Sequence, residues 1–231
     1  MTPLSAPHFS ATGRQTGIAA LFDVDNTLLP GQASEVRFFR FLWKRGLVGW
    51  REVRDSIHWV LRCAPPVSLH PLRERKLYLA GKGAAEVRAL AEEFCRTELC
   101  PRLSAQGLSR MDEHRRAGHH IVLVTGSLDF LIAPLAALLE VPTLLAARLE
   151  QQERQFTGQV CAPLPYGPGK RELIARLTRD SGIDLAQSFA YGDSPGDVEL
   201  LEMVGHPLVV NPIRGMDRIA QRNGWPMTTW T

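Results

Sequence analysis

The chain has 231 residues, 45% of them hydrophobic and 22% charged, and a formal net charge of +3. This length and composition are typical of a folded protein with one sizeable core and room for a smaller domain. No apolar stretch approaches the ~20 residues that a membrane-spanning helix needs, and the four cysteines lack both CxxC spacing and a small disulfide-rich context. These features exclude an integral membrane protein and a disulfide-stabilised scaffold, and they predict reduced thiols in the cytoplasm.

Residues 1–17 lack the basic and then apolar layout of a signal peptide, and we expect them to form a flexible extension. The apolar run 18–22 predicts a short buried strand, which is followed by a pentad, 23–27, containing Asp23 and Asp25. Alternate side chains of an extended segment point the same way, so both carboxylates would face the ligand-binding edge of an α/β sheet. Their proximity would raise the pKa of one of them, which suits a nucleophile beside a proton donor.

About a hundred residues separate this pentad from the next predicted strand, far more than the crossover of a parallel sheet needs. Apolar residues recur at helical spacing over 35–61 and again over 72–100, with proline and glycine breakers between the segments. We therefore predict an inserted all-helical cap of about four helices over 32–101. The α/β core would comprise 18–31 and 102–231.

The predicted cap is strongly basic. Residues 36–76 contain ten Arg or Lys and three Asp or Glu, so this segment alone carries +7. A cationic cap can attract anionic substrates, and the interleaved Trp43, Trp50 and Trp59 would allow it to touch an anionic membrane surface. The alternative is a solvated cationic helix face with the tryptophans packed inside the cap, and this is the arrangement we expect. No base-reading motif accompanies the charge, so no nucleic-acid partner is expected.

The helical pattern 102–117 returns the chain to the core, with Gly118 as the predicted stop. Three histidines lie near its end, at His114, His119 and His120. They lack the usual spacing of a zinc site with cysteine partners. We expect them to be partly solvated helix-end residues.

Two further apolar runs, 121–124 and 188–191, predict short buried strands. Polar residues follow each strand or open the helix between them: Thr125, Gly126 and Ser127, then Lys170 within 167–170, then Asp193 and Asp197. Because the loops after parallel strands gather on one edge of a sheet, these groups would meet the carboxylates of the pentad. Carboxylate oxygens suit Mg²⁺, whereas a lysine and backbone amides at a helix start suit a phosphate group.

In this order, the motifs resemble the four motifs of the haloacid dehalogenase superfamily of aspartyl-phosphate phosphohydrolases. The matches are Asp23-x-Asp25-x-Thr27, Thr125, Lys170 and Gly192-Asp193-x-x-x-Asp197. The stretch 144–170 is similar to the β-hairpin region of subfamily IB, which includes the phosphoserine phosphatases. The resemblance implies a doubly wound parallel, Rossmann-like α/β sheet with an inserted all-helical cap.

The resemblance also implies a Mg²⁺-dependent phosphomonoesterase. Asp23 would attack phosphorus to form an aspartyl phosphate, and Asp25 would protonate the leaving alkoxide and then activate water. Asp23, the backbone carbonyl of Asp25 and Asp193 would hold the metal. Asp197 would orient these ligands or bind the metal through water.

The remaining motif residues would act on the phosphoryl group. Thr125, the amides near Gly126 and Lys170 would balance its charge. Ser127 is an alternative phosphate contact, because the motif can be read two residues later. Thr27 would support the loop.

Two positions bear on the substrate. Phosphoserine phosphatases carry a glutamate seven residues after the second aspartate and an asparagine before the last one, where this chain has Gln32 and Gly196. Both departures argue against phosphoserine, although Glu35 lies nearby. Other small amine phosphates such as histidinol phosphate, and lipid or sugar phosphates, stay open. So do a phosphotransferase with the same intermediate, a lipid-phosphate phosphatase at a membrane surface, a non-catalytic binding or scaffold protein, and the oligomeric state.

Overall fold

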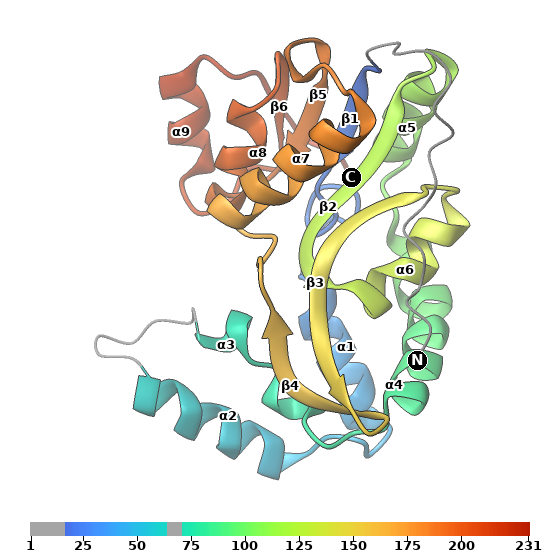
Figure 1. Cartoon of the computed structure of the whole chain (residues 1–231), viewed down its shortest axis with the longest axis vertical. Helices are drawn as coiled ribbons and strands as arrows, with labels where there is room; N and C mark the ends of the chain where they lie inside the picture. Colours follow the sequence, from blue (N-terminus) through green and yellow to red (C-terminus); the bar gives the residue numbers. More distant parts are fainter. Residues whose placement is uncertain (1–16, 64–70) are drawn as a thin grey trace.

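The computed structural model describes residues 17–63 and 71–231, so the predicted N-terminal extension lies outside it apart from Gly17. Within these residues, a seven-stranded sheet runs in the order β4-β3-β2-β1-β5-β6-β7 (Figure 1). Neighbouring strands are parallel except β3 and β4, which form the predicted antiparallel hairpin. The strands are β1 (Ala19–Phe22), β2 (His120–Leu128), β3 (Thr143–Gln152), β4 (Gln155–Cys161), β5 (Phe189–Gly192), β6 (His206–Val210) and β7 (Met227–Thr228).

Helices cover both faces of the sheet (Figure 1). They are α5 (Ala105–Arg116), α6 (Asp129–Leu138), α7 (Pro168–Ser181), α8 (Val198–Glu202) and α9 (Met216–Asn223). Successive residues of β1 belong to different hydrophobic clusters: Phe22 packs in the cluster that contains Leu131 of α6, and Leu21 in the cluster that contains Ile174 of α7. Strands buried on both faces are apolar at every position, which explains the continuous apolar runs in the sequence and confirms the doubly wound α/β prediction.

The strand order reverses at β1, which has β2 on one side and β5 on the other. Ligands bind at such a reversal, outside the carboxyl ends of the strands. The predicted strands 121–124 and 188–191 are β2 and β5. β2 continues four residues beyond its predicted end, with a register shift against β3 between Val124 and Leu128. The predicted stop of α5 is also confirmed, since Gly118 adopts a φ of +76° there.

The cap follows β1 and contains the helices α1 (Ser34–Lys44), α2 (Trp50–Cys63), α3 (Pro71–Glu74) and α4 (Ala84–Phe94). Between α3 and α4 the chain runs along the hairpin and hydrogen-bonds with it. The pairs are Lys76 N–H to Gly158 O (2.7 Å), Gly81 N–H to Phe156 O (2.8 Å), Phe156 N–H to Lys82 O (3.0 Å) and Ala84 N–H to Arg154 O (2.8 Å). The helical pattern in the sequence did not indicate this pairing. The domain limits at 32 and 101 stay a prediction.

The tryptophans do not all pack inside the cap, which corrects our expectation. Trp43 and Trp59 are half-buried, whereas Trp50 is 77% exposed. The reason is the orientation of α2. Its other side carries Glu52, which forms an ion pair with Lys82, and Trp59, whose ring lies under Arg75.

A second correction concerns the histidines. His114 is buried rather than solvated: its Nε2 lies 2.7 Å from the Tyr191 hydroxyl and its Nδ1 lies 2.8 Å from Nδ1 of His119. Burial, followed by the charges of His119 and Arg110, lowers the pKa of His114 to about 4. Among the described residues, no helix is long and apolar enough to cross a membrane.

Candidate active site

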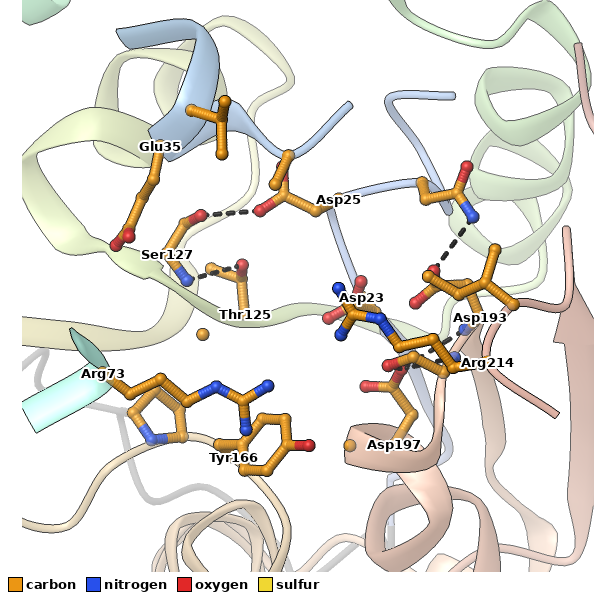
Figure 2. Close-up of a pocket in the computed structure, with 18 of the residues that line it drawn as sticks. Asp23, Asp25, Glu35, Arg73, Thr125, Ser127, Tyr166, Asp193, Asp197 and Arg214 are labelled. Atoms are coloured by element: carbon orange, nitrogen blue, oxygen red, sulfur yellow. Dashed lines mark hydrogen bonds between the residues drawn. The ribbon is translucent and has the colours of Figure 1, made fainter. Parts of the chain in front are cut away.

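The carboxyl ends of β1, β2 and β5 open into a cavity of about 520 Å³ (Figure 2). Core loops form one side, and residues of α1 and α3 from the cap form the other. All of the predicted site residues line this cavity except Thr27. Thr27 is fully buried, and its hydroxyl has no hydrogen-bond partner among the described residues.

Asp23 and Lys170 meet at the floor of the cavity, and both are buried. Asp23 directly follows β1, where its N–H donates to the carbonyl of Tyr191 at 2.9 Å. The Nζ of Lys170 donates to Oδ1 of Asp23 at 2.8 Å, to the carbonyl of Val124 at 3.2 Å and to the carboxylate of Asp197. Although burial opposes its charge, the carboxylates of Asp197 and Asp23 raise the pKa of Lys170 above its usual value. This lysine is therefore a fixed positive charge beside the predicted nucleophile.

The start of α7 places Lys170 there. α7 begins at Pro168, as the sequence predicts for proline at a first helical position. A side chain at Gly169 would bring its Cβ within 1.7 Å of the carbonyl oxygen of Leu164. Only glycine lets the first turn of α7 approach this backbone so closely. The next residue, Lys170, then lies beside Asp23 and the carbonyl of Val124.

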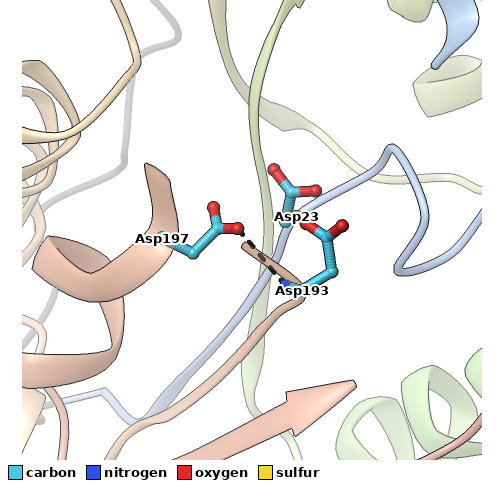
Figure 3. A group of neighbouring side chains, drawn as sticks. All are labelled: Asp23, Asp193 and Asp197. Carbon is cyan, nitrogen blue, oxygen red and sulfur yellow. Dashed lines mark hydrogen bonds between the residues drawn. The ribbon is translucent and has the colours of Figure 1, made fainter. Parts of the chain in front are cut away.

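Asp193 and Asp197 complete a buried acidic cluster with Asp23 (Figure 3). One carboxylate oxygen of each lies within 4.8 Å of the others. Burial and the charge of Asp197 raise the pKa of Asp23 well above its usual range and that of Asp193 to about 7. Burial acts in the same sense on Asp197, but Lys170 and hydrogen bonds from Ser194 hold its pKa below the usual value. A divalent cation would relieve this repulsion, so the donor set fits one.

Two asparagines to which the sequence reasoning gave no role hold Asp193 in place. Asn26 donates from Nδ2 to the Asp193 carboxylate at 2.9 Å and to the carbonyl of Asn211 at 3.0 Å. Asn211 returns a hydrogen bond to the carbonyl of Asn26 at 2.8 Å. Both residues have positive φ, of +58° and +47°. Asparagine tolerates this conformation better than most residues, so the asparagine within the pentad was the available signal.

Asp25 does not lie against Asp23 as an extended segment would place it. The chain turns after Asp23, and the carboxylate of Asp25 accepts hydrogen bonds from Ser34 at the start of α1, through both N–H (2.7 Å) and hydroxyl. Its other oxygen accepts from the hydroxyl of Ser127 at 2.6 Å (Figure 2). The pKa of Asp23 is raised, as predicted for one of the two carboxylates, and the largest causes are burial and the charge of Asp197.

The polar end of β2 presents different groups to the cavity. Thr125 is buried, and its Oγ1 accepts from the N–H of Ser127 at 3.1 Å. Gly126 is exposed at the cavity wall. The Ser127 hydroxyl donates to the carboxylate of Asp25. The Thr125 hydroxyl donates to no carboxylate in the part of the chain that the structure describes, so it is the better placed of the two to contact a phosphate group. These three residues lie within the register shift of β2 against β3.

The side chains of Gln32 and Glu35, the two candidate specificity residues, point in different directions. Gln32 is exposed, and its Oε1 accepts from Arg40 at 2.6 Å. Glu35 points into the cavity (Figure 2), where its Oε2 accepts from Lys76 at 2.6 Å. Its other oxygen, Oε1, is buried and has no hydrogen-bond partner within residues 17–63 and 71–231. Burial, partly offset by Lys76, raises the pKa of Glu35. Of the two, Glu35 is the residue that places a carboxylate on the cavity wall.

The cavity is also lined by residues that the sequence reasoning did not assign to the site, among them Arg73, Tyr166 and Arg214. The guanidinium of Arg73 lies 3.4 Å from the centre of the Tyr166 ring, within the range of a cation–π contact. Arg214 follows β6 and has a φ of +55°. The basic composition of 36–76 was the signal for Arg73; the other two follow from loop geometry and had none.

Comparison with known protein families agrees with the geometry of this site. A family model described as haloacid dehalogenase-like hydrolase matches residues 20–202. The chain belongs to this family. Together with the relatives named below, the assignment confirms the predicted phosphatase class.

The chain is also similar to individual proteins and to a solved structure. "Probable phosphatase Rv3661" of Mycobacterium tuberculosis (strain ATCC 25618 / H37Rv) is 30% identical over 235 residues, covering 100% of this chain and 80% of the relative. "Phosphoserine phosphatase SerB1" of the same strain is 30% identical over 215 residues, covering 90% and 69%. A crystal structure of a protein with unknown function from Bordetella pertussis Tohama I matches with a TM-score of 0.79 and 31% identity, covering 92% and 98%.

Proposed function

We propose that this phosphatase is a Mg²⁺-dependent phosphomonoesterase that acts on small phosphate esters through a phosphorylated Asp23. The observation that carries the proposal is the buried cluster in which Asp23 contacts Lys170 and lies beside Asp193 and Asp197. A lone carboxylate at this depth would be protonated, whereas a lysine and a bound cation keep it ionised and reactive.

Asp23, Asp193 and the backbone carbonyl of Asp25 would hold the metal. Asp197, which is bonded to Lys170 and to the backbone N–H of Ser194 at 3.1 Å, would orient these ligands. When bound, Mg²⁺ supplies positive charge to the phosphoryl oxygens and lowers the pKa of the carboxylates around it.

In the first step, a carboxylate oxygen of Asp23 forms a bond to phosphorus as the bond from phosphorus to the leaving oxygen breaks. Asp25 gives its proton to that oxygen, so the alcohol leaves neutral. Lys170, the Thr125 hydroxyl and the amide of Gly126 balance the charge on the transferring group. Ser34 and Ser127 position Asp25 through their hydrogen bonds to it.

In the second step, Asp25 takes a proton from water as the water oxygen bonds to phosphorus. The bond between phosphorus and Asp23 breaks, which releases inorganic phosphate and restores both carboxyl groups to their starting states. Hydrolysis thus needs one water and one proton carrier, and Asp25 serves both steps.

The cap side of the cavity supports a substrate class. Glu35 supplies a carboxylate there and Arg73 a cation, so we propose a small, phosphoserine-like or histidinol-phosphate-like ester with a hydrogen-bond donor in its leaving group. We place this activity in the cytoplasm, since the described cysteines are free thiols, as in reducing compartments.

The decisive experiment measures release of p-nitrophenol and inorganic phosphate from p-nitrophenyl phosphate, with Mg²⁺, with EDTA and after Mg²⁺ is restored. Equal release of both products that depends on Mg²⁺ is expected. Full activity in excess EDTA would refute the metal requirement. An excess of nitrophenol over phosphate when an alcohol is added would identify a phosphotransferase instead.

A further inference from the structure

The outer face of α2 carries an unusual concentration of exposed apolar side chains. Trp50 is 77% exposed, Ile57 is 53% exposed and Leu61 is 65% exposed. The described residues include seven exposed large hydrophobics, so nearly half of them lie on this one helix. Their spacings of seven and four residues put them on a single stripe along the helix axis.

Basic side chains border this stripe. Arg51, Arg54 and Arg62 are all exposed. At 100° per residue they lie roughly 40° to 120° around the helix from Trp50, on one side of the stripe. Asp55 is the exposed acid of α2, and it pairs with Arg54 at 3.2 Å. The outer surface of α2 is therefore apolar along one line and cationic along the next.

We propose that this face of α2, formed by Trp50, Ile57 and Leu61 with Arg51, Arg54 and Arg62, docks the protein on an anionic lipid surface. A helix that lies in a membrane interface inserts an apolar stripe and keeps arginines at its border, where they meet lipid phosphates. Tryptophan is favoured at that depth because its ring is apolar and its N–H is polar.

The position of α2 permits this docking. α2 lies at the lower end of the molecule in Figure 1, far from α9, and its inner side packs against α3 and the turn Leu77–Leu79. None of the six docking residues lines the catalytic cavity. α1 and α3 flank α2 in the chain and contribute Glu35 and Arg73 to that cavity, so docking would hold the cavity close to the lipid surface.

The test is co-sedimentation of the full chain with vesicles of phosphatidylcholine alone and of phosphatidylcholine mixed with phosphatidylglycerol. Binding to the anionic vesicles only, weakened by added salt, is expected. The triple variant Trp50→Gln, Ile57→Gln, Leu61→Gln should lower the partition coefficient by about tenfold or more. Leu138→Gln is the matched control, because Leu138 is 59% exposed on α6, outside the docking face. It should bind like the wild type.

The contribution of charge is tested separately. The double variant Arg54→Gln, Arg62→Gln should reduce binding to anionic vesicles and flatten its salt dependence. The control is Arg179→Gln, Arg222→Gln, which removes two exposed arginines of the core without touching α2. If the two double variants lost vesicle binding equally, the effect would be one of net charge, and the assignment of the docking face to α2 would be overturned.

Two other results would also overturn it. One is wild-type binding by the triple variant. The other is a wild type that binds no vesicles but self-associates in sedimentation equilibrium, with the self-association lost in the triple variant. The face of α2 would then bind a second copy of the chain. Unchanged far-UV circular dichroism shows that each variant is folded. Because the vesicle measurement needs no turnover, its outcome is independent of the proposed phosphatase mechanism.

Discussion

The ring of Tyr166 fills the space that a side chain at Gly196 would need. A Cβ atom at position 196 would lie 2.4 Å from Cε2 of that ring, and the N–H of Gly167 donates to the carbonyl of Gly196 at 3.1 Å. The guanidinium of Arg73 stacks on the same ring. Glycine at 196, where phosphoserine phosphatases have asparagine, thus allows an aromatic ring and a cap cation to line the cavity together.

This relationship predicts the effect of Gly196→Ala. The added methyl group must displace the Tyr166 ring and with it Arg73, so kcat/KM should fall by about tenfold, or ~1.4 kcal/mol. The same substitution in a Tyr166→Ala background should cost little more, because the clash is gone. A double-mutant cycle on kcat/KM measures this coupling. Additive losses would mean that the ring is not the cause.

Asp23→Asn should abolish turnover while the fold is kept. The amide has nearly the same shape but cannot act as an anionic nucleophile, so the rate should fall more than about a thousandfold, or ~4 kcal/mol. Asp217→Asn, on the exposed surface of α9, is the control and should retain full activity. Residual activity of Asp23→Asn above that level would remove Asp23 from the role of nucleophile.

Asp25→Asn should separate substrates by their leaving groups. An alkyl alcohol needs a proton as it leaves, whereas p-nitrophenolate does not. Alkyl phosphates should therefore be slowed by about a hundredfold more than p-nitrophenyl phosphate in a single-turnover measurement. Equal slowing of both substrates would argue against Asp25 as proton donor.

Glu35 and Gln32 should respond differently to substitution. Gln32 is turned toward Arg40, so Gln32→Glu should leave the ratio of kcat/KM for phosphoserine to that for glycerol phosphate unchanged. Glu35→Gln removes the charge that faces the cavity and should lower this ratio by about fivefold, or ~1 kcal/mol, the scale of a partly exposed ion pair. If Gln32→Glu changed this ratio of kcat/KM values and Glu35→Gln did not, position 32 would be the specificity position, as the sequence comparison suggested.

His114 should make the protein less stable as the pH falls. Its pKa is near 6.5 in an unfolded chain and about 4 in the fold, so the unfolded state binds more protons between these values. The free energy of unfolding should therefore decline as pH falls from about 6.5 to 4, by up to ~3 kcal/mol. Urea unfolding of the wild type and of His114→Gln across this range isolates the contribution, and the variant should show the smaller decline. Parallel curves would contradict it.

Much of the site could be predicted because its signals are local. Asp23, Thr125 and Asp193 each follow an apolar run, and parallel strands bring such ends to one edge whatever else the chain does. Lys170 was predictable for a similar reason, since the proline and glycines before it mark a helix start.

The rest depends on how distant segments pack. Asp25 bonds to Ser34 because α1 begins beside it, and no periodicity within either segment encodes that contact. The outward position of Trp50 depends on which side of α2 meets its neighbours. His114 was misjudged because its partner, Tyr191, is 77 residues away in the chain.

The hydrogen bonds between the segment 76–84 and the hairpin constrain how the cavity can open. A cap that swung away by itself would break four backbone hydrogen bonds, each worth about 1 kcal/mol. If the hairpin moves with the cap, all four stay intact. A motion that left these four bonds intact would have to carry the β3–β4 hairpin with the cap, and it would then act on the parallel pairing of β3 with β2 in the core.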